Sequence, residues 1–254
     1  MTSRRRLAIE LVRRRLVADV EEAGSLLDAD RVLVNGAVAD TLDRLVATHD
    51  ALTITDLARF VGRGGEKLDR ALDELTVDAA GRRWLDAGAS TGGFTDCLLQ
   101  RGATHVVALD VGHGHLHPTL RADSRVTVLE RTNVRHADTA TIDGPVDGVV
   151  ADLSFISLTR VLGALVALCK PCAPMVLLVK PQFEASKAEV SAGRGVITDP
   201  AIHHRVRETI DAALTELGVT VLGWVTSSVT GANGNLELFV HGRTPSPDTP
   251  TGDR

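Results

Sequence analysis

A glycine-rich run and a carboxylate downstream of it carry the clearest chemical signal in the sequence. The run Leu85–Thr95 reads LDAGASTGGFT, which is typical of a strand, a tight turn and the start of a helix. Glycines let a backbone approach a ligand closely, and a helix N-terminus offers free N–H groups. Asp110 stands at the predicted end of the next strand, 22 residues after Gly88. A carboxylate there can accept hydrogen bonds from both hydroxyls of an adenosine ribose.

The run lacks the motifs of two related kinds of site. It contains neither the GxGxxG of dinucleotide-binding folds nor the Gly-Lys-Ser/Thr of a phosphate-binding loop, so an adenosine cofactor without a pyrophosphate fits best. The alternatives are a merely tight strand-to-helix turn and, for Asp110, a helix cap. The expected cofactor contacts are Gly88, Ala89, Ser90, Gly92, Gly93, Phe94, Asp110, Val111, Asn133 and Asp152.

Alternating strands and helices position these residues. Expected strands cover residues 84–87, 106–110, 126–129, 146–152 and 175–180, and the expected helices include 94–100 and 158–168. This alternation predicts an α/β fold with a Rossmann-like, mostly parallel sheet, which binds ligands at the carboxyl ends of its strands. Only nine residues separate the last two strands, 219–226 and 236–241, so the last strand is expected to be antiparallel.

The first 56 residues predict a separate small α+β domain. An apolar stripe that begins at Leu7 indicates a helix, and a second helix is expected over 20–27. The turn Asn35-Gly36 indicates a hairpin, closed by a strand near 51–55. We expect a linker over 57–63, the large domain over 64–243, and a disordered tail rich in Pro, Thr and Asp over 244–254.

Charge and hydrophobicity narrow the class of protein. A net charge of −5 argues against indiscriminate coating of nucleic acid but allows a local basic patch. The most apolar region, 161–179, is interrupted by Lys170, Pro171 and Pro174 and is too broken to span a membrane. No apolar run follows the arginines at the N-terminus, so no secretory signal is expected and the protein is placed in the cytoplasm.

Two groups of residues raise the alternative of a metal site. Cys169 and Cys172 form a CxxC pair, and His113, His115 and His117 alternate within one loop. Neither group has the second pair of ligands that a zinc site needs, so no metal is expected and the thiols are expected to be reduced and structural.

Five motifs occur in an order that resembles a known family. They are FVGRGGEKL from Phe60, LDAGASTGGFT from Leu85, ADLSFIS from Ala151, LVKPQFE around Lys180, and GNLELF from Gly234. Together they resemble the TlyA family of ribosomal RNA 2′-O-methyltransferases, also labelled hemolysin A, whose catalytic domain is similar to FtsJ-type enzymes. The resemblance implies S-adenosylmethionine as cofactor and ribosomal RNA as partner, with cytidine in 16S or 23S RNA as the acceptor.

The resemblance also implies a catalytic set of two lysines and two acids. The matching positions are Lys67, Asp152, Lys180 and Glu237. In such a set, Lys180 would stabilise the alkoxide that develops on the ribose, or accept the proton of the 2′-hydroxyl. The two acids would orient the lysines. Lys67 would steer the hydroxyl. Each of the four could instead be a cap, a strand end or a solvated side chain.

The N-terminal domain resembles an S4 RNA-binding domain. Its expected RNA contacts are Arg4, Arg6, Arg13, Arg14 and Arg31, and Phe155 of the large domain is expected to stack on a base or to pack in the core. Residues 1–56 hold eight Arg, no Lys and ten acids, so contact with RNA depends on clustering of the arginines. Ala18-Asp19-Val20 replaces the Ser-Arg pair usual in the family, and Phe60 stands where some relatives have Trp.

Other functions remain open from the sequence. A non-catalytic RNA-binding or assembly protein could keep the fold, and a small-molecule methyltransferase would not need the N-terminal domain. Direct membrane lysis, as the hemolysin label suggests, would need a spanning or amphipathic lytic segment that the sequence lacks. The expected oligomeric state is a monomer.

Overall fold

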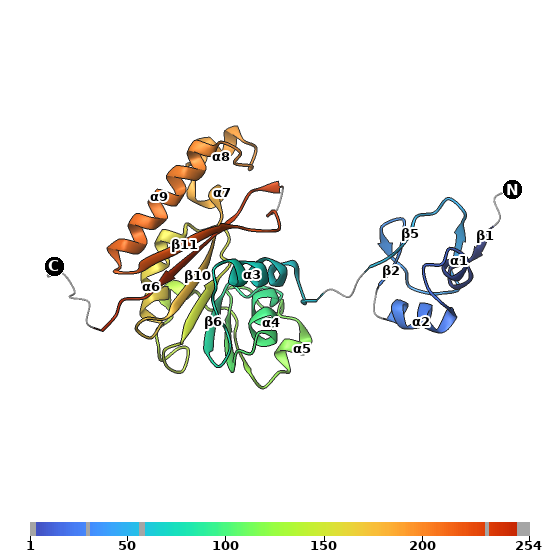
Figure 1. Cartoon of the computed structure of the whole chain (residues 1–254), viewed down its shortest axis with the longest axis horizontal. Helices are drawn as coiled ribbons and strands as arrows, with labels where there is room; N and C mark the ends of the chain where they lie inside the picture. The colour runs from blue at the N-terminus through green and yellow to red at the C-terminus, as the bar shows by residue number, and fades with distance from the viewer. Residues whose placement is uncertain (1–3, 29–30, 56–58, 232–233, 248–254) are drawn as a thin grey trace. The chain divides into compact units, whose positions relative to one another are not determined.

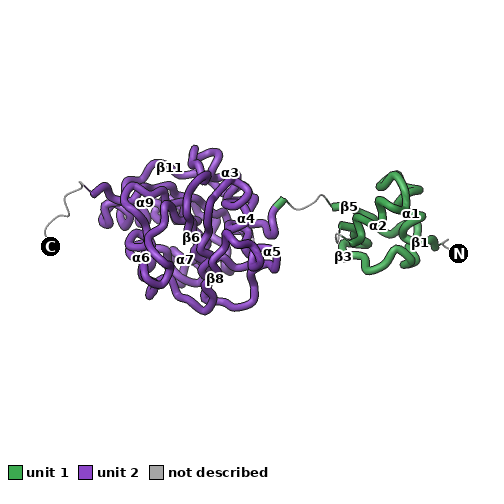
Figure 2. The backbone as a smooth tube through the Cα atoms, turned by 90° about the horizontal axis from the view of Figure 1, so that it is seen from below, with its two compact units in different colours: residues 1–59 green, residues 60–254 purple. Residues whose placement is uncertain are grey.

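The computed structural model describes residues 4–28, 31–55, 59–231 and 234–247. The chain divides into two compact units, residues 1–59 and 60–254, which Figure 2 colours separately. The described residues contain no helix long and apolar enough to cross a membrane.

The first unit packs two helices against short strands. The helices are α1 (Leu7–Arg13) and α2 (Val20–Asp28). β1 (Arg4–Arg6) pairs antiparallel with β4 (Leu45–Ala47), and β2 (Val32–Val34) lies between β3 (Ala37–Val38) and β5 (Leu52–Ile54). Asn35 and Gly36 both have positive φ, as the tight turn between β2 and β3 requires. The expected α+β pattern is present, with an additional strand pair, β1–β4.

The second unit is built on a seven-stranded sheet in the order β11-β12-β10-β9-β6-β7-β8. Figure 1 labels β6, β10 and β11 of this sheet. The strands are β6 (Arg83–Ala87), β7 (His105–Leu109), β8 (Val126–Leu129), β9 (Gly148–Ala151), β10 (Pro174–Val179), β11 (Thr220–Thr226) and β12 (Leu238–Arg243). β6 to β10 are parallel, and β12 is antiparallel to both β10 and β11. The expected mostly parallel sheet with an antiparallel last strand is confirmed.

Helices cover both faces of this sheet because side chains alternate along its strands. The helices are α3 (Arg63–Glu74), α4 (Gly93–Gln100), α5 (Pro118–Arg121), α6 (Leu162–Ala167), α7 (Pro181–Glu184), α8 (Lys187–Ala192) and α9 (Pro200–Glu216). Leu85 and Leu177 belong to the core beneath α6 and α9, whereas Trp84 and Val176 belong to the core beneath α3 and α4. Two apolar layers therefore sandwich the sheet.

Several expected boundaries differ from the structure. The helix expected over 158–168 is a short 3-10 turn, η2 (Leu158–Arg160), followed by α6. Phe60, expected in the linker, is only 4% exposed and packs in the core beneath α3; residues 56–58 lie outside the described residues. The disordered tail was expected from residue 244, but Thr244 is buried and bonds the backbone of Lys170 and Ala173. Residues 248–254 lie outside the described residues.

Candidate active site

The glycine turn after β6 lies directly against the segment that follows β9. Gly88 has φ +87°, and a Cβ atom there would stand 2.4 Å from the carbonyl oxygen of Asp152. The Asp152 N–H in turn donates to the carbonyl of Ala87 at 3.0 Å. A side chain at Gly88 would thus force apart two neighbouring strand ends, which explains the requirement for glycine.

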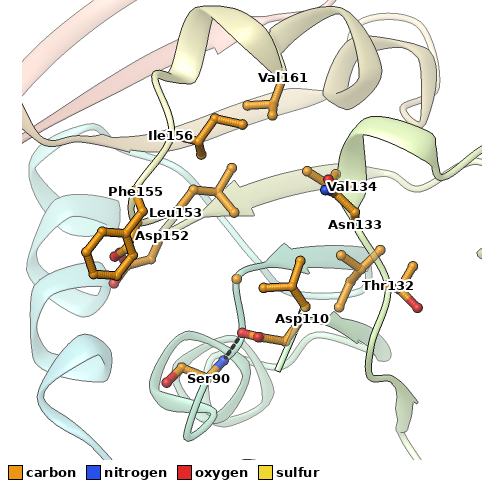
Figure 3. Close-up of a pocket in the computed structure, with 14 residues that line it drawn as sticks. Ser90, Asp110, Thr132, Asn133, Val134, Asp152, Leu153, Phe155, Ile156 and Val161 are labelled. Atoms are coloured by element: carbon orange, nitrogen blue, oxygen red, sulfur yellow. Dashed lines mark hydrogen bonds between the residues drawn. The ribbon is translucent and has the colours of Figure 1, made fainter. Parts of the chain in front are cut away.

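Asp110 faces this turn. It follows β7, and its carboxylate accepts the N–H of Ser90 at 2.8 Å and the N–H of Gly112 at 2.6 Å. Figure 3 shows the bond to Ser90 at the edge of a cavity. A carboxylate offers about four lone-pair directions, so two backbone donors leave capacity for a ligand hydroxyl.

A cavity of about 440 Å³ opens at the carboxyl ends of the parallel strands. Six of the expected cofactor residues line it: Gly88, Ser90, Asp110, Val111, Asn133 and Asp152. Phe155, expected as an RNA contact, also lines it, and the sequence reasoning missed the rest of its wall, namely Leu109, Thr132, Val134, Leu153, Ser154, Ile156 and Val161. Most of these flank residues that were expected, so proximity to the motifs was the available signal.

Four expected cofactor residues are not in the wall of this cavity. Ala89 and Phe94 are nearly fully buried, and the Phe94 ring lies 6.0 Å from that of Phe239 in the core. Gly92 packs against the side chain of Leu120, and a Cβ atom on Gly93 would come 2.8 Å from the backbone of Gly65. These residues set the position of α4 rather than the surface of the cavity.

Lys180 and Asp152 meet at one side of the cavity. Asp152 directly follows β9 and Lys180 directly follows β10, which are parallel neighbours. The Lys180 Nζ lies 2.5 Å from Asp152 Oδ1 and donates to Ser154 Oγ at 3.0 Å. The carboxyl ends of two strands therefore deliver one cation and one carboxylate to the same point.

Lys67 of α3 and Glu237, which directly precedes β12, form a second ion pair. Val179 of β10 pairs with Leu238 of β12, so the residues just beyond them, Lys180 and Glu237, end the same strand ladder. The Lys67 Nζ reaches Glu237 Oε2 at 2.6 Å from α3. Glycines at the α3–α4 contact permit this reach, because α3 approaches the backbone of α4 two residues before Lys67. All four expected catalytic residues thus lie in two ion pairs.

An open groove of about 610 Å³ adjoins the cavity and shares Phe155 and Ile156 with it. Phe155 is 92% exposed, has φ +64°, and its ring lies 5.3 Å from that of Phe183. Exposed aromatic rings beside cations are typical of surfaces that stack bases, and Arg160 and Lys187 line the same groove. Of the two options for Phe155, the structure excludes core packing.

The arginines of the first unit divide into two classes. Arg14 is a structural residue: it donates to the Glu10 carboxylate and to the backbone carbonyls of Ala47, Thr48 and Asp50. These four hydrogen bonds leave the Arg14 guanidinium little capacity for a phosphate, and its expected role as an RNA contact stays a prediction. Arg13 is held by the same buried Glu10.

The remaining expected arginines differ in the contacts that their side chains make within the first unit. Arg31 donates through Nε to the carbonyl of Thr55 at 2.7 Å. Arg4 and Arg6 lie exposed on β1, where Arg6 makes a 3.4 Å ion pair with the exposed Asp43. Arg4 and Arg6 are thus the most available of the expected contacts.

Comparison with known proteins places this site in a family. The FtsJ-like methyltransferase family matches residues 60–244. The 16S/23S rRNA (cytidine-2′-O)-methyltransferase TlyA of Mycobacterium tuberculosis is 48% identical over 96% of this chain and 91% of that protein. The chain belongs to the TlyA family. A 23S rRNA (cytidine-2′-O)-methyltransferase TlyA of Campylobacter jejuni is 31% identical over 91% of this chain and 96% of its own length.

Solved structures agree with this assignment. A proposed hemolysin from Streptococcus thermophilus is 34% identical, with a TM-score of 0.73 over 99% of this chain and 93% of that chain. The N-methyltransferase NodS from Bradyrhizobium japonicum, solved with S-adenosyl-L-homocysteine, is 17% identical over 73% of this chain and 89% of that chain, with a TM-score of 0.53, and shows that the fold is shared. The resemblance of the five motifs to TlyA-type proteins is confirmed.

Proposed function

We propose that this TlyA-family protein transfers a methyl group from S-adenosylmethionine to ribose 2′-hydroxyls of cytidine in 16S and/or 23S ribosomal RNA. The observation that carries the proposal is the meeting of Lys180 and Asp152 at the wall of the cavity. The same activity is printed in the names of relatives in the family. The proposed enzyme acts as a monomer in the cytoplasm, where ribosomal subunits are found.

The cavity suits the adenosine part of S-adenosylmethionine. The carboxylate of Asp110 would accept the ribose hydroxyls, and Asn133 would contact the adenine. The apolar side chains of Val111, Leu153 and Ile156 would cover the base. Gly88 and Ser90 line the same cavity. When bound, the cofactor supplies an activated methyl group on a sulfonium.

Methyl transfer is an in-line displacement, so holding the acceptor oxygen in place supplies much of the acceleration. As the 2′-oxygen bonds to the methyl carbon, the carbon–sulfur bond would break and the hydroxyl proton would pass to solvent in the open groove. Meanwhile the Lys180 ammonium would donate to that oxygen and stabilise the negative charge developing on it. Asp152 and Ser154 hold that ammonium in position. Lys67, fixed by Glu237, would steer the acceptor hydroxyl. The residues of this chain thus supply orientation and electrostatic stabilisation.

RNA would be held by two surfaces, each within one unit. Phe155 and Phe183 would stack on bases beside the acceptor, with Arg160 and Lys187 on the phosphates. Arg4 and Arg6 of the first unit would add phosphate contacts, supported by Arg13 and Arg31.

The test is a map of 2′-O-methylated nucleotides in ribosomal RNA from cells with and without this protein. We expect cytidine methylation that disappears on deletion, returns with the wild-type gene, and does not return with Lys180→Ala. Identical maps from the two strains, with expression of the protein verified, would instead indicate a non-catalytic RNA-binding protein.

A further inference from the structure

Two segments far apart in sequence are joined at both ends around the proposed active site. The first is the stretch Asp152–Leu158, which we call the β9 loop, and the second is Lys180–Glu184, which consists of Lys180 and α7. At one end, the Lys180 Nζ contacts Asp152 and Ser154. In the middle, the rings of Phe155 and Phe183 lie 5.3 Å apart. The far end is held by a residue with no role so far, Glu184.

Glu184 binds the β9 loop with both carboxylate oxygens. Its Oε2 accepts the hydroxyl of Ser157 at 2.6 Å, and its Oε1 accepts the N–H of Leu158 at 2.7 Å. Leu158 begins the 3-10 turn η2, and the Ser157 side chain does not cap that turn. A carboxylate from a different element therefore caps the end of the β9 loop.

The Glu184 carboxylate is partly buried and holds a loop with a strained residue. Burial raises the pKa of Glu184, and the hydrogen bonds from Leu158 and Ser157 oppose that rise. The loop it holds contains Phe155, a non-glycine residue with φ +64° whose side chain is 92% exposed. A positive φ and an exposed phenyl ring both cost free energy, and such strain persists only where surrounding contacts fix it.

We propose that Glu184 is a positioning residue of the methyl-transfer reaction. By fixing the far end of the β9 loop, it holds Phe155 over the groove and keeps Asp152 beside Lys180. The loop also forms one wall of the cofactor cavity, so a single carboxylate sets the geometry of both subsites. This inference rests on the proposed function.

The experiment compares Glu184→Ala and Glu184→Gln with wild type, using ribosomal subunits from cells that lack this protein. Single-turnover methyl transfer, the dissociation constant for S-adenosylmethionine and the melting temperature are measured for each. We expect Glu184→Ala to slow transfer by about 10- to 100-fold, because a displacement near 1 Å at a reacting group costs that much. Glu184→Gln should retain most activity, since its amide can accept from Leu158 and donate to Ser157.

A double-mutant cycle with Phe155→Ala separates positioning from general destabilisation. Because Phe155 is one of the groups that the β9 loop positions, Glu184→Ala should cost less in the Phe155→Ala background than alone. The matched control is Glu189→Gln: Glu189 lies five residues later, caps α8 and pairs with Arg205, and its substitution should leave transfer unchanged.

Two results would overturn the inference: full activity of Glu184→Ala, or losses from Glu184→Ala and Phe155→Ala that simply multiply. A wild-type protein that methylates no subunit would count against the proposed function itself, and the two failures are therefore distinct.

Discussion

The Lys67 ammonium lies 2.6 Å from a carboxylate oxygen of Glu237, although 170 residues separate the two in sequence. The Lys67 and Glu237 side chains are only 11% and 3% exposed, respectively. A buried ion pair stabilises a fold weakly, but removal of one partner leaves an uncompensated charge. The pair is therefore better explained by the geometry of the active site than by stability.

Lys67→Met should accordingly destabilise the protein and abolish methyl transfer. Loss of the Lys67 ammonium leaves the buried Glu237 carboxylate without a cationic partner. This lowers the free energy of unfolding by about 3 kcal/mol. The double variant Lys67→Met/Glu237→Gln should recover most of that stability without recovering activity. Denaturant unfolding and methyl-transfer assays on the same preparations measure the two effects.

A matched control for this prediction is the pair Lys170–Asp147, also 2.6 Å apart but with side chains 52% and 31% exposed. Lys170→Met should change the free energy of unfolding by less than about 1 kcal/mol and leave transfer intact. Recovery of activity in the double variant would show that the Lys67–Glu237 pair has only a structural role.

Lys180→Met should lower the transfer rate by at least about 100-fold, because it removes the donor to the acceptor oxygen. Affinity for S-adenosylmethionine should change little, since Lys180 does not line the cofactor cavity. Calorimetric titration and single-turnover kinetics distinguish the two effects. A large loss of cofactor affinity with an unchanged rate would assign Lys180 to cofactor binding.

The sequence predicted the parts of this site that local pattern determines. Alternating apolar runs located the strands, and residues at their carboxyl ends, Asp110 and Asp152, lie at the cavity as expected. The motif resemblance identified Lys67 and Glu237, whose contact depends on how α3 packs against α4. The pattern of residues along one sequence does not show which side chains of two packed elements will meet.

Other features could not be read from residue types. Arg14 belongs to a cluster of arginines that looks uniform in sequence, yet its guanidinium makes four hydrogen bonds within the first unit. Phe94 lies in the glycine-rich motif that was expected to bind the cofactor, but its side chain is buried in the core, where its ring lies near that of Phe239. Glu184 follows a recognised motif lysine, and only the fold brings it to Ser157.

The two classes of arginine in the first unit predict different consequences of substitution. Arg4→Ala with Arg6→Ala should weaken RNA binding and reduce the slope of log affinity against log salt by about 1 to 2, because phosphate contacts are lost. Filter binding over a salt series measures this slope. Stability of the unit should be nearly unchanged.

Arg14→Ala should instead loosen the first unit. The backbone carbonyls of Ala47, Thr48 and Asp50 lose their donor, and the buried Glu10 loses a partner. Hydrogen exchange followed by mass spectrometry should show faster exchange over residues 45–54. An unchanged exchange pattern with a reduced salt slope would return Arg14 to the class of RNA contacts.

Asp86 predicts a pH dependence of stability. It lies fully buried on β6, accepts the Thr95 hydroxyl at 2.7 Å through Oδ2, and its Oδ1 has no hydrogen-bond partner among the described residues. Burial raises its pKa to about 7, against the Thr95 bond and with help from Asp152 and Asp110.

Because the pKa of Asp86 is raised on folding, the folded state binds its proton more tightly than the unfolded chain. Its contribution to stability is therefore retained below about pH 3.8, lost progressively as the pH rises toward 7, and absent above 7.

Asp86→Asn keeps an acceptor for Thr95 and removes the ionisation. The variant should melt several degrees above wild type at pH 8, and the difference should disappear near pH 4. Scanning fluorimetry of both proteins at each pH, with Asp211→Asn as a control carboxylate on α9, measures the difference. Parallel curves for wild type and Asp86→Asn would show that Asp86 does not titrate in this range.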